Sequence, residues 1–186
     1  IFGCLLDDDQ GGHFRVRPTV DVFNRHQLYY PDTAILVTRF LTEAGVGEVI
    51  DFMPIASTEV ASSRHRLVRM LRCVRGEMTF ALDIAPRFDY GREPHETHVS
   101  EDGVVFQGVR TAMSLNIIRE PDEPRLGHVE QASAEGLKLE LPLQAGQMRG
   151  MVLEVGEPRP VRLVRVAEAW QLFDETVRFW RSWLGQ

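Results

Sequence analysis

The 186-residue chain is predicted to be mainly β: a large antiparallel β-sandwich of the supersandwich type with one C-terminal α-helix. About ten short segments alternate apolar and polar residues, which is the period of two expected of a half-buried strand. Turns separate these segments, as they do in antiparallel sandwiches. The last segment changes to the period of a helix, so we expect a sandwich over 1–163 and a helical extension over 164–186.

Composition narrows the class of protein. Hydrophobic residues make up 44% of the chain, which allows a sizeable core, and the length fits one domain. The net charge of −6 argues against nucleic acid as a partner, and no apolar run is long enough for a membrane span. Cys4 and Cys73 are too few for a disulfide framework, so we expect reduced thiols and a cytoplasmic location.

The first third of the chain contains strand-like segments separated by turns. They are residues 13–18, 24–30, 34–42 and 46–52. Pro31 ends the second segment because proline cannot donate a hydrogen bond to a sheet. The turn Glu43-Ala44-Gly45 lies between the third and fourth segments, and it predicts a hairpin.

Residues 65–75 fit two interpretations, because their apolar side chains suit either a helical stripe or a strand with two buried faces. The following segment, 78–84, is a clear strand whose even-numbered residues are all apolar. The turn Arg75-Gly76-Glu77 leads straight into it. We therefore predict that 65–75 is a strand covered on both faces and joined to 78–84 by a hairpin.

The second half continues the strand pattern. A polar loop is expected over 93–102 and another over 119–125. The predicted strands are 104–107, a half-buried strand over 112–117, a regular Leu-rich strand over 137–143, and 151–155 as the partner of that strand after the Gln144-Ala145-Gly146 turn. The final helix carries an apolar stripe of Phe173, Val177, Trp180 and Leu184, with Trp170 and Trp183 beside it and Gly185 as its stop.

The segment from Arg87 to Arg92 is the most unusual in composition. It places two aromatic residues, two arginines and a carboxylate directly after a strand that ends at Pro86. One interpretation is a turn in which Asp89 caps local backbone groups and the arginines are solvated. The other is a contact surface for another domain or for a ligand.

Known metal and cofactor motifs do not occur. His95-Glu96-Thr97-His98 lacks the spacing that puts two imidazoles one helical turn apart, so we expect two solvated histidines. Asp7-Asp8-Asp9 lacks the spaced pattern of a calcium loop and is expected to be a solvated turn. We expect both cysteines to be buried as small apolar residues. The sequence therefore predicts no metal site and no cofactor.

Several segments together resemble the N-terminal domain of the trehalase- and glucoamylase-like enzymes of glycoside hydrolase family 15. They occur in the order of that family, and the resemblance as a whole runs from about Phe2 to the C-terminal tryptophan helix, which is nearly the whole chain. They are Leu5-Leu6-Asp7 with Gly11-Gly12, Tyr29 to Thr33, Thr38-Arg39-Phe40, Asp51 to Pro54, Val74-Arg75-Gly76 and Arg87 to Arg92.

The resemblance implies a noncatalytic domain, because in that family the catalytic glutamates lie in an (α/α)₆ toroid that follows the sandwich. The implied partners are that catalytic domain of the same polypeptide and the trehalose or α-glucan substrate of the parent enzyme. No catalytic residue is expected here. The candidate domain-interface residues are Arg87, Phe88, Asp89, Tyr90, Arg92, Trp180 and Trp183. The alternatives are an independent carbohydrate-binding module, with Phe88 and Tyr90 as its platform, and a structural or homo-oligomerisation domain.

Overall fold

The computed structural model describes residues 2–7, 10–55, 65–123, 128–133 and 136–185, and in these ranges it is mainly β with one long helix. The elements are β1 (His13–Pro18), β2 (Asn24–Tyr29), β3 (Leu36–Leu41), β4 (Gly45–Phe52), β5 (His65–Ala85), the 3₁₀ turn η1 (Asp89–Gly91), β6 (Glu96–Ser100), β7 (Gly103–Gln107), β8 (Ala112–Ile118), β9 (His128–Ser133), β10 (Gly136–Gln144), β11 (Met148–Gly156) and α2 (Val166–Leu184). The predicted fold class is confirmed.

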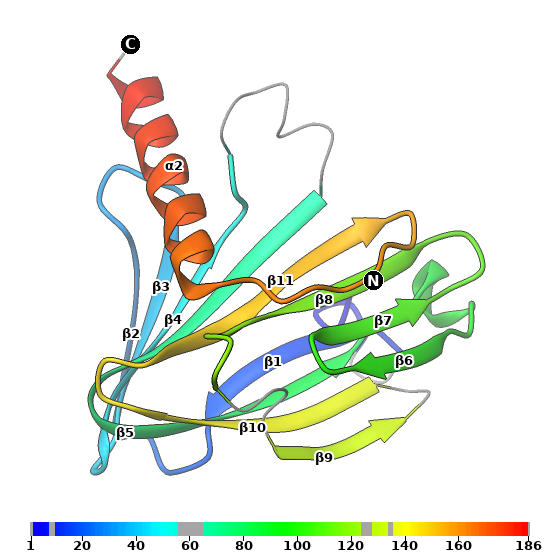
Figure 1. The fold of residues 1–186 in the computed structure, drawn as a ribbon, viewed down its shortest axis with the longest axis horizontal. Coiled ribbons are helices and arrows are strands. Elements are labelled where there is room, and N and C mark those ends of the chain that lie inside the picture. Colours follow the sequence, from blue (N-terminus) through cyan, green and yellow to red (C-terminus); the bar gives the residue numbers. More distant parts are fainter. Residues whose placement is uncertain (1, 8–9, 56–64, 124–127, 134–135, 186) are drawn as a thin grey trace.

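The strands form two stacked antiparallel sheets (Figure 1). The long sheet has the order β2-β3-β4-β5-β11-β8-β7-β6. The short sheet is built from β1, β5, β10 and β9. β2 is at one edge of the long sheet, and all of its residues are exposed.

The strand β5 belongs to both sheets, which corrects the predicted hairpin around Gly76. It runs unbroken from His65 to Ala85. Its first half pairs with β4 and β11, and its second half pairs with β1 and β10. The strand changes sheet near Gly76, whose φ of +70° lies in the left-handed region. Glycine in that conformation suits a hairpin and a sheet corner alike, so the local sequence does not separate the two.

The corner changes which side chains of β5 face the space between the sheets. Before it, the odd-numbered Leu71 and Cys73 lie in the inter-sheet core, and after it the even-numbered Met78 and Phe80 do so. On the opposite face of the first half, Met70 packs in a second core. The prediction that residues 65–75 form a strand covered on both faces is thus confirmed.

The connection from β10 to β11 crosses between the sheets beside the same corner, so the predicted pairing of these strands is wrong. β10 pairs with the second half of β5 and with β9, whereas β11 pairs with the first half of β5 and with β8. The N–H of Ala145 donates to the carbonyl of Gly76 at 2.9 Å, and that of Gly146 donates to the carbonyl of Cys73 at 2.9 Å. An alternating pattern identifies a strand but leaves its neighbour unspecified.

Two cores hold the layers together. The inter-sheet core contains the predicted leucines of β10, which are at most 3% exposed: Leu137, Leu139, Leu141 and Leu143. The second core lies between the outer face of the long sheet and α2, where Phe173 and Val177 are buried against Phe52 and Val68. The helix therefore forms a third layer (Figure 1).

Other local predictions divide into confirmed and corrected ones. The hairpin of β3 and β4 is confirmed, and α2 ends at Gly185 as expected. The polar segment 93–102 is not a loop throughout, because it contains β6. All 7 residues of β8 are buried, so this strand is not half-buried. Residues 8, 9, 124 and 125, which belonged to predicted turns or loops, lie outside the described residues.

None of the helices in the described part of the chain is both long and apolar enough to cross a membrane.

Candidate domain interface

The turn that follows β5 is held in an unusual backbone conformation. Asp89, Tyr90 and Gly91 have φ values of 43°, 58° and 80°, so successive residues adopt the left-handed conformation. This conformation is costly for a tyrosine. Tyr90 is nevertheless 84% exposed, whereas the preceding Phe88 is only 1% exposed and packs in the inter-sheet core. Phe88 thus anchors the turn, and Tyr90 is presented at its tip.

Asp89 and Arg92 stabilise this turn. The guanidinium of Arg92 donates through Nη2 to Oδ1 of Asp89 at 3.1 Å and through Nε to the Asp89 carbonyl at 3.1 Å. It also lies 5.6 Å from the centre of the Tyr90 ring, within range of a cation–π contact. The guanidinium of Arg87 donates to the carbonyl of Pro86 at 3.0 Å. The turn interpretation expected Asp89 to cap backbone groups beside solvated arginines; its carboxylate instead accepts from the Arg92 guanidinium, and the 3₁₀ turn has no side-chain cap.

Two other loops brace the turn. Oε1 of Glu93 accepts a hydrogen bond from the N–H of Val109 at 2.5 Å. At Gly91, an added Cβ would lie 3.0 Å from the carbonyl oxygen of Gln10. The turn therefore touches both the β7–β8 loop and the N-terminal turn, so two segments of the family resemblance meet here. We call this region the loop end; its exposed apolar residues are Leu5, Leu6, Tyr90 and Val109.

His95 lies beneath the loop end and is not the solvated residue that its polar neighbours predicted. Its ring is 5.4 Å from Phe88 and 5.7 Å from Phe106. Its Nε2 is buried and has no hydrogen-bond partner within the described residues. Burial, together with the positive charge of Arg87, holds the pKa of His95 below its ordinary value of 6.5. The fold therefore favours the neutral imidazole.

The distal half of α2 carries the remaining interface candidates. Trp180 packs edge-to-face against Phe179 and Trp183, with ring centres 5.7 Å apart in both pairs. Trp183 is 57% exposed, and Leu184 beside it is similarly exposed. Figure 1 places α2 at one end of the molecule and β6 and β7 at the other. The turn η1 directly precedes β6 in the chain. The structure thus separates the predicted interface residues into two surfaces.

An extended segment, 157–164, which we call the strap, fixes the start of α2 to the long sheet (Figure 1). The buried Asn116 accepts the N–H of Arg162 at 3.0 Å. The N–H of Val164 donates to the carbonyl of Ile117 at 2.9 Å. Arg162 also donates to Glu168 in the first turn of α2, and this hydrogen bond holds the pKa of Glu168 below its ordinary value. Sheet, strap and helix are thereby linked.

Sequence reasoning missed the strap because Ser114 and Asn116 looked like the solvent face of β8. In the structure the strap covers that face, and Oγ of Ser114 lies 3.5 Å from the carbonyl oxygen of Arg159. A polar side chain in a strand can be satisfied either by water or by a backbone segment that covers it. The alternating polar residues of β8 were therefore the only sequence signal for the strap, and they did not distinguish it from solvent.

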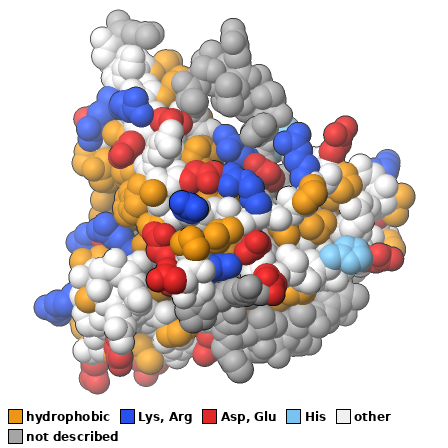
Figure 2. Space-filling view, in the orientation of Figure 1, with side chains coloured by type: hydrophobic (Ala, Val, Ile, Leu, Met, Phe, Trp, Pro, Cys, Tyr) orange, Lys and Arg blue, Asp and Glu red, His pale blue; other side chains and the backbone are white. Residues whose placement is uncertain are grey.

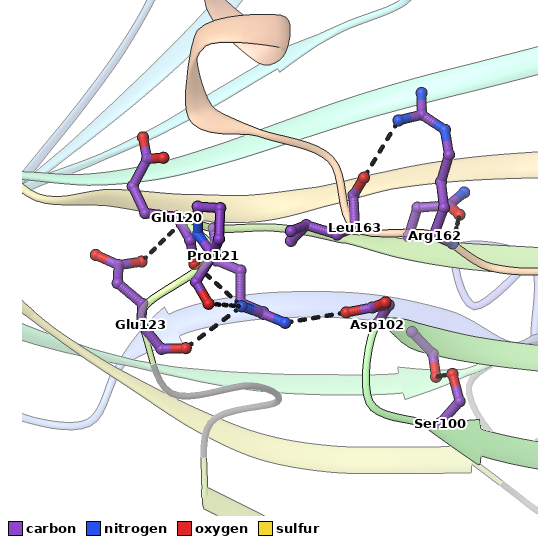
Figure 3. A network of polar contacts seen from close by, with 10 residues as sticks. Ser100, Asp102, Glu120, Pro121, Glu123, Arg162 and Leu163 are labelled. Carbon is purple, nitrogen blue, oxygen red and sulfur yellow. Dashed lines mark hydrogen bonds and ion pairs between the residues drawn. The ribbon is translucent and has the colours of Figure 1, made fainter.

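Arg119 joins three connections near the start of α2. Figure 3 labels its partners Asp102, Glu120, Pro121 and Glu123. Only 4% of Arg119 is exposed. Its Nη2 lies 3.0 Å from Oδ1 of Asp102 in the β6–β7 turn, and its backbone N–H donates to the strap at Val164. Its Nη1 donates to the carbonyls of Glu120, Pro121 and Glu123 in the β8–β9 loop at 3.0, 3.2 and 3.4 Å.

Two other buried charges support the same region. Burial lowers the pKa of Arg149, which lies 3.8 Å from Glu123. Glu48, only 2% exposed, accepts hydrogen bonds from Nε of Arg72 at 2.6 Å and Nε of Arg39 at 2.7 Å. A buried carboxylate between two guanidiniums needs no other counter-charge. These arginines bridge β3, β4 and β5 beneath α2.

The described residues contain no group of three His, Cys, Asp or Glu side chains that could hold a metal ion. Cys4 and Cys73 are free thiols. Burial raises the pKa of Cys73, and its carbonyl neighbours Arg75 and Gly76 accept weak hydrogen bonds from it at 3.4 Å. Cys73 is thus an unreactive buried thiol, whereas Cys4 is partly exposed.

Comparison with known proteins gives the following matches. Residues 1–118 match the family described as "Trehalase-like, N-terminal". Trehalase 1 of Sulfolobus acidocaldarius is 33% identical over 106 residues, which cover 57% of this chain and 17% of that protein. The trehalase of Mycolicibacterium smegmatis is 30% identical over 106 residues, 50% of this chain and 16% of that protein. The matched region thus spans less than a fifth of these relatives.

Among solved structures, a chain described as a kojibiose phosphorylase from the human microbiome aligns over 90% of this chain and 27% of its own length. The sequence identity is 8% and the TM-score is 0.46, which is too low to support an argument about the fold.

Proposed function

The chain belongs to the trehalase-like N-terminal domain family, and from this premise we propose that it is the noncatalytic sandwich domain of a larger glycoside hydrolase. We assign the parent enzyme to glycoside hydrolase family 15, acting on trehalose or related α-glucosides through a separate (α/α)₆ catalytic domain. One observation carries the proposal: the chain matches an N-terminal domain family, and its curated relatives are trehalases several times longer than the matched region.

The distal half of α2 is the surface that best fits a role in supporting the catalytic domain. The first half of the helix is buried against the long sheet and fixed by the strap, so its direction is set by the sandwich. The second half exposes Trp183 and Leu184 beside Trp180. Tryptophan is enriched among the residues that dominate protein interfaces. A rigid helix with an exposed aromatic end is well suited to dock a following domain.

The loop end is the second proposed contact. Tyr90 is held in a costly conformation, and strain of this kind concentrates where a surface has a function. Arg92 supplies a planar donor beside it, a residue type well suited to polar interfaces. A catalytic domain larger than this chain is big enough to contact both α2 and the loop end.

The environments of two paired carboxylates, those of Glu48 and Glu168, are unlike those of catalytic acids, which supports a noncatalytic role for this chain. A glycosidase general acid needs a raised pKa, and its partner needs access to water and substrate. Glu48 is instead enclosed between Arg39 and Arg72, and hydrogen bonding to Arg162 lowers the pKa of Glu168. The free thiols are consistent with a cytoplasmic enzyme, which is the location we propose.

The test compares this chain with the complete parent enzyme. The purified chain should release no glucose from trehalose, maltose or starch, whereas the parent enzyme should hydrolyse at least one of them. Trp183→Ala and Tyr90→Ala should leave the melting temperature of the isolated chain nearly unchanged and lower that of the parent enzyme. Tyr29→Ala, an exposed aromatic on the edge strand β2, is the matched control. Glucose release by the chain alone, abolished by changing one of its acidic residues, would overturn the proposal.

A further inference from the structure

A cavity of about 440 Å³ lies where the first turns of α2 meet the β10–β11 turn and the start of the β8–β9 loop. Its lining includes Arg72, Glu120, Gln147, Met148, Val166 and Trp170. The volume falls within the range of ~300–1,000 Å³ that small-molecule sites occupy. None of these residues belongs to the two proposed interface surfaces.

Several polar groups of the lining keep hydrogen-bonding capacity for a ligand. Arg72 uses Nε to bind Glu48, and the described part of the chain shows no partner for its terminal nitrogens. Gln147 accepts the N–H of Gln144 through Oε1 at 2.8 Å, which leaves its amide nitrogen as a donor. The backbone N–H of Glu120 donates to the carboxylate of Glu123. The carboxylate of Glu120 itself points away from Glu123 in Figure 3. The cavity therefore combines donors with an acceptor.

Trp170 and its neighbours supply an apolar wall. The indole is half-buried, and Phe173 packs against it edge-to-face with ring centres 5.4 Å apart, which fixes the ring plane. Met148 and Val166 continue the apolar surface. A fixed aromatic ring beside convergent polar groups suits a ligand with one apolar face and several hydroxyl groups at its edge.

The charges around the cavity favour a neutral ligand. Arg72 and Arg39 share the single carboxylate of Glu48, and the positive charge left over is opposed by the carboxylate of Glu120 in the lining. Glu123 lies 3.8 Å from Arg149. Figure 2 likewise shows acidic and basic side chains interleaved with hydrophobic ones across the face that carries α2 and the strap. A field without one dominant sign gives little attraction to a phosphate or a dicarboxylate.

We propose that this cavity is a noncatalytic binding site for a neutral mono- or disaccharide, stacked on Trp170 and hydrogen-bonded by Arg72, Glu120 and Gln147. The inference goes beyond the proposed function, because a domain that only supports a catalytic domain needs no sugar site. It also replaces the Phe88–Tyr90 platform that the sequence offered for a carbohydrate-binding module, since Phe88 is buried in the core.

The experiment is calorimetric titration of this chain with trehalose and with maltose, using sorbitol as an acyclic polyol control. We expect binding of at least one of the two sugars and none of sorbitol. Glu120→Gln and Gln147→Ala should each weaken binding about tenfold, the effect of losing ~1.4 kcal/mol of hydrogen bonding. Glu157→Gln, an exposed change outside this cavity, should bind like the unchanged chain.

A second pair of variants locates the stacking ring. Trp170→Phe should reduce affinity and remove the sugar-dependent change in tryptophan fluorescence, whereas Trp183→Phe should preserve both. The proposal is overturned if neither sugar binds at 100-fold excess over the chain, or if Trp183→Phe abolishes binding instead. Sugar binding unaffected by both Glu120→Gln and Gln147→Ala would also exclude this cavity. None of these results depends on hydrolysis by the parent enzyme, so this inference and the proposed function fail separately.

Discussion

Replacing Gly76 by alanine tests whether the β5 corner requires glycine. The left-handed φ of +70° costs an alanine ~1–2 kcal/mol. An added Cβ would also lie 2.0 Å from the carbonyl oxygen of Ala44, so the start of β4 must move. Displacing packed structure adds ~1–3 kcal/mol. The expected loss in the free energy of unfolding is therefore about 2–5 kcal/mol, the sum of these two costs.

Gly146 provides the matched control at the same corner. Its φ is +86°, but an added Cβ would meet nothing within 4 Å. Gly146→Ala should therefore cost only the conformational ~1–2 kcal/mol. Thermal melting followed by circular dichroism and urea denaturation would measure both variants, with ~2–4 °C of melting temperature expected for each kcal/mol at this chain length. Equal losses for the two variants, or an unchanged midpoint for Gly76→Ala, would refute the argument from close approach.

Four further predictions follow from the same structure. Leu139→Ala should lower the free energy of unfolding by ~2–5 kcal/mol in urea denaturation, because it opens a hole in the inter-sheet core, and an unchanged midpoint would rule out the register of β10. Stability should fall as the pH drops below about 6.5, because the pKa of His95 is lower in the folded chain than in the unfolded chain, which therefore binds the proton more readily. His95→Phe should flatten this part of the pH profile of stability. A variant profile that keeps its slope would contradict a buried neutral imidazole. Asn116→Ala should cost ~1–3 kcal/mol and raise hydrogen exchange in the first turn of α2 by releasing the strap, whereas normal protection there would show that Asn116 does not hold it. Tyr90→Gly should stabilise the isolated chain slightly, because the left-handed cost of ~1–2 kcal/mol that it removes exceeds the ~0.5–1 kcal/mol of extra folding entropy that glycine loses; a lower melting temperature would show that the Tyr90 ring contributes more than its backbone costs.

The sequence predicted the elements better than their connections. Alternation within β10 identified its buried leucines because the pleat fixes which residues share a face. It did not identify the neighbours of β10, because pairing depends on residues far along the chain. Gly76 illustrates the same limit, since one left-handed glycine serves a hairpin or a sheet corner. In both places the long-range partner decided the structure.

The candidate surfaces show a similar division. The Arg87–Arg92 turn and the tryptophans of α2 were visible because unusual residue types cluster within a few positions. The Arg119 cluster was not visible, because its partner Asp102 and the carbonyls that it binds come from separate loops. The sugar-site candidates Arg72, Glu120 and Trp170 also lie far apart in sequence. Such sites are assembled by the fold and carry no local pattern.

The shared strand β5 also sets how the domain must be assembled during synthesis. Its partners extend from β1, beginning at His13, to β11, ending at Gly156, so neither sheet closes until most of the chain has left the ribosome. Folding dominated by such distant pairings is slow, on the order of milliseconds to seconds. Until β11 arrives, the first half of β5 presents an unpaired edge to neighbouring chains, in addition to the exposed edge of β2. Truncation before β11 should therefore produce aggregates rather than a smaller soluble sandwich.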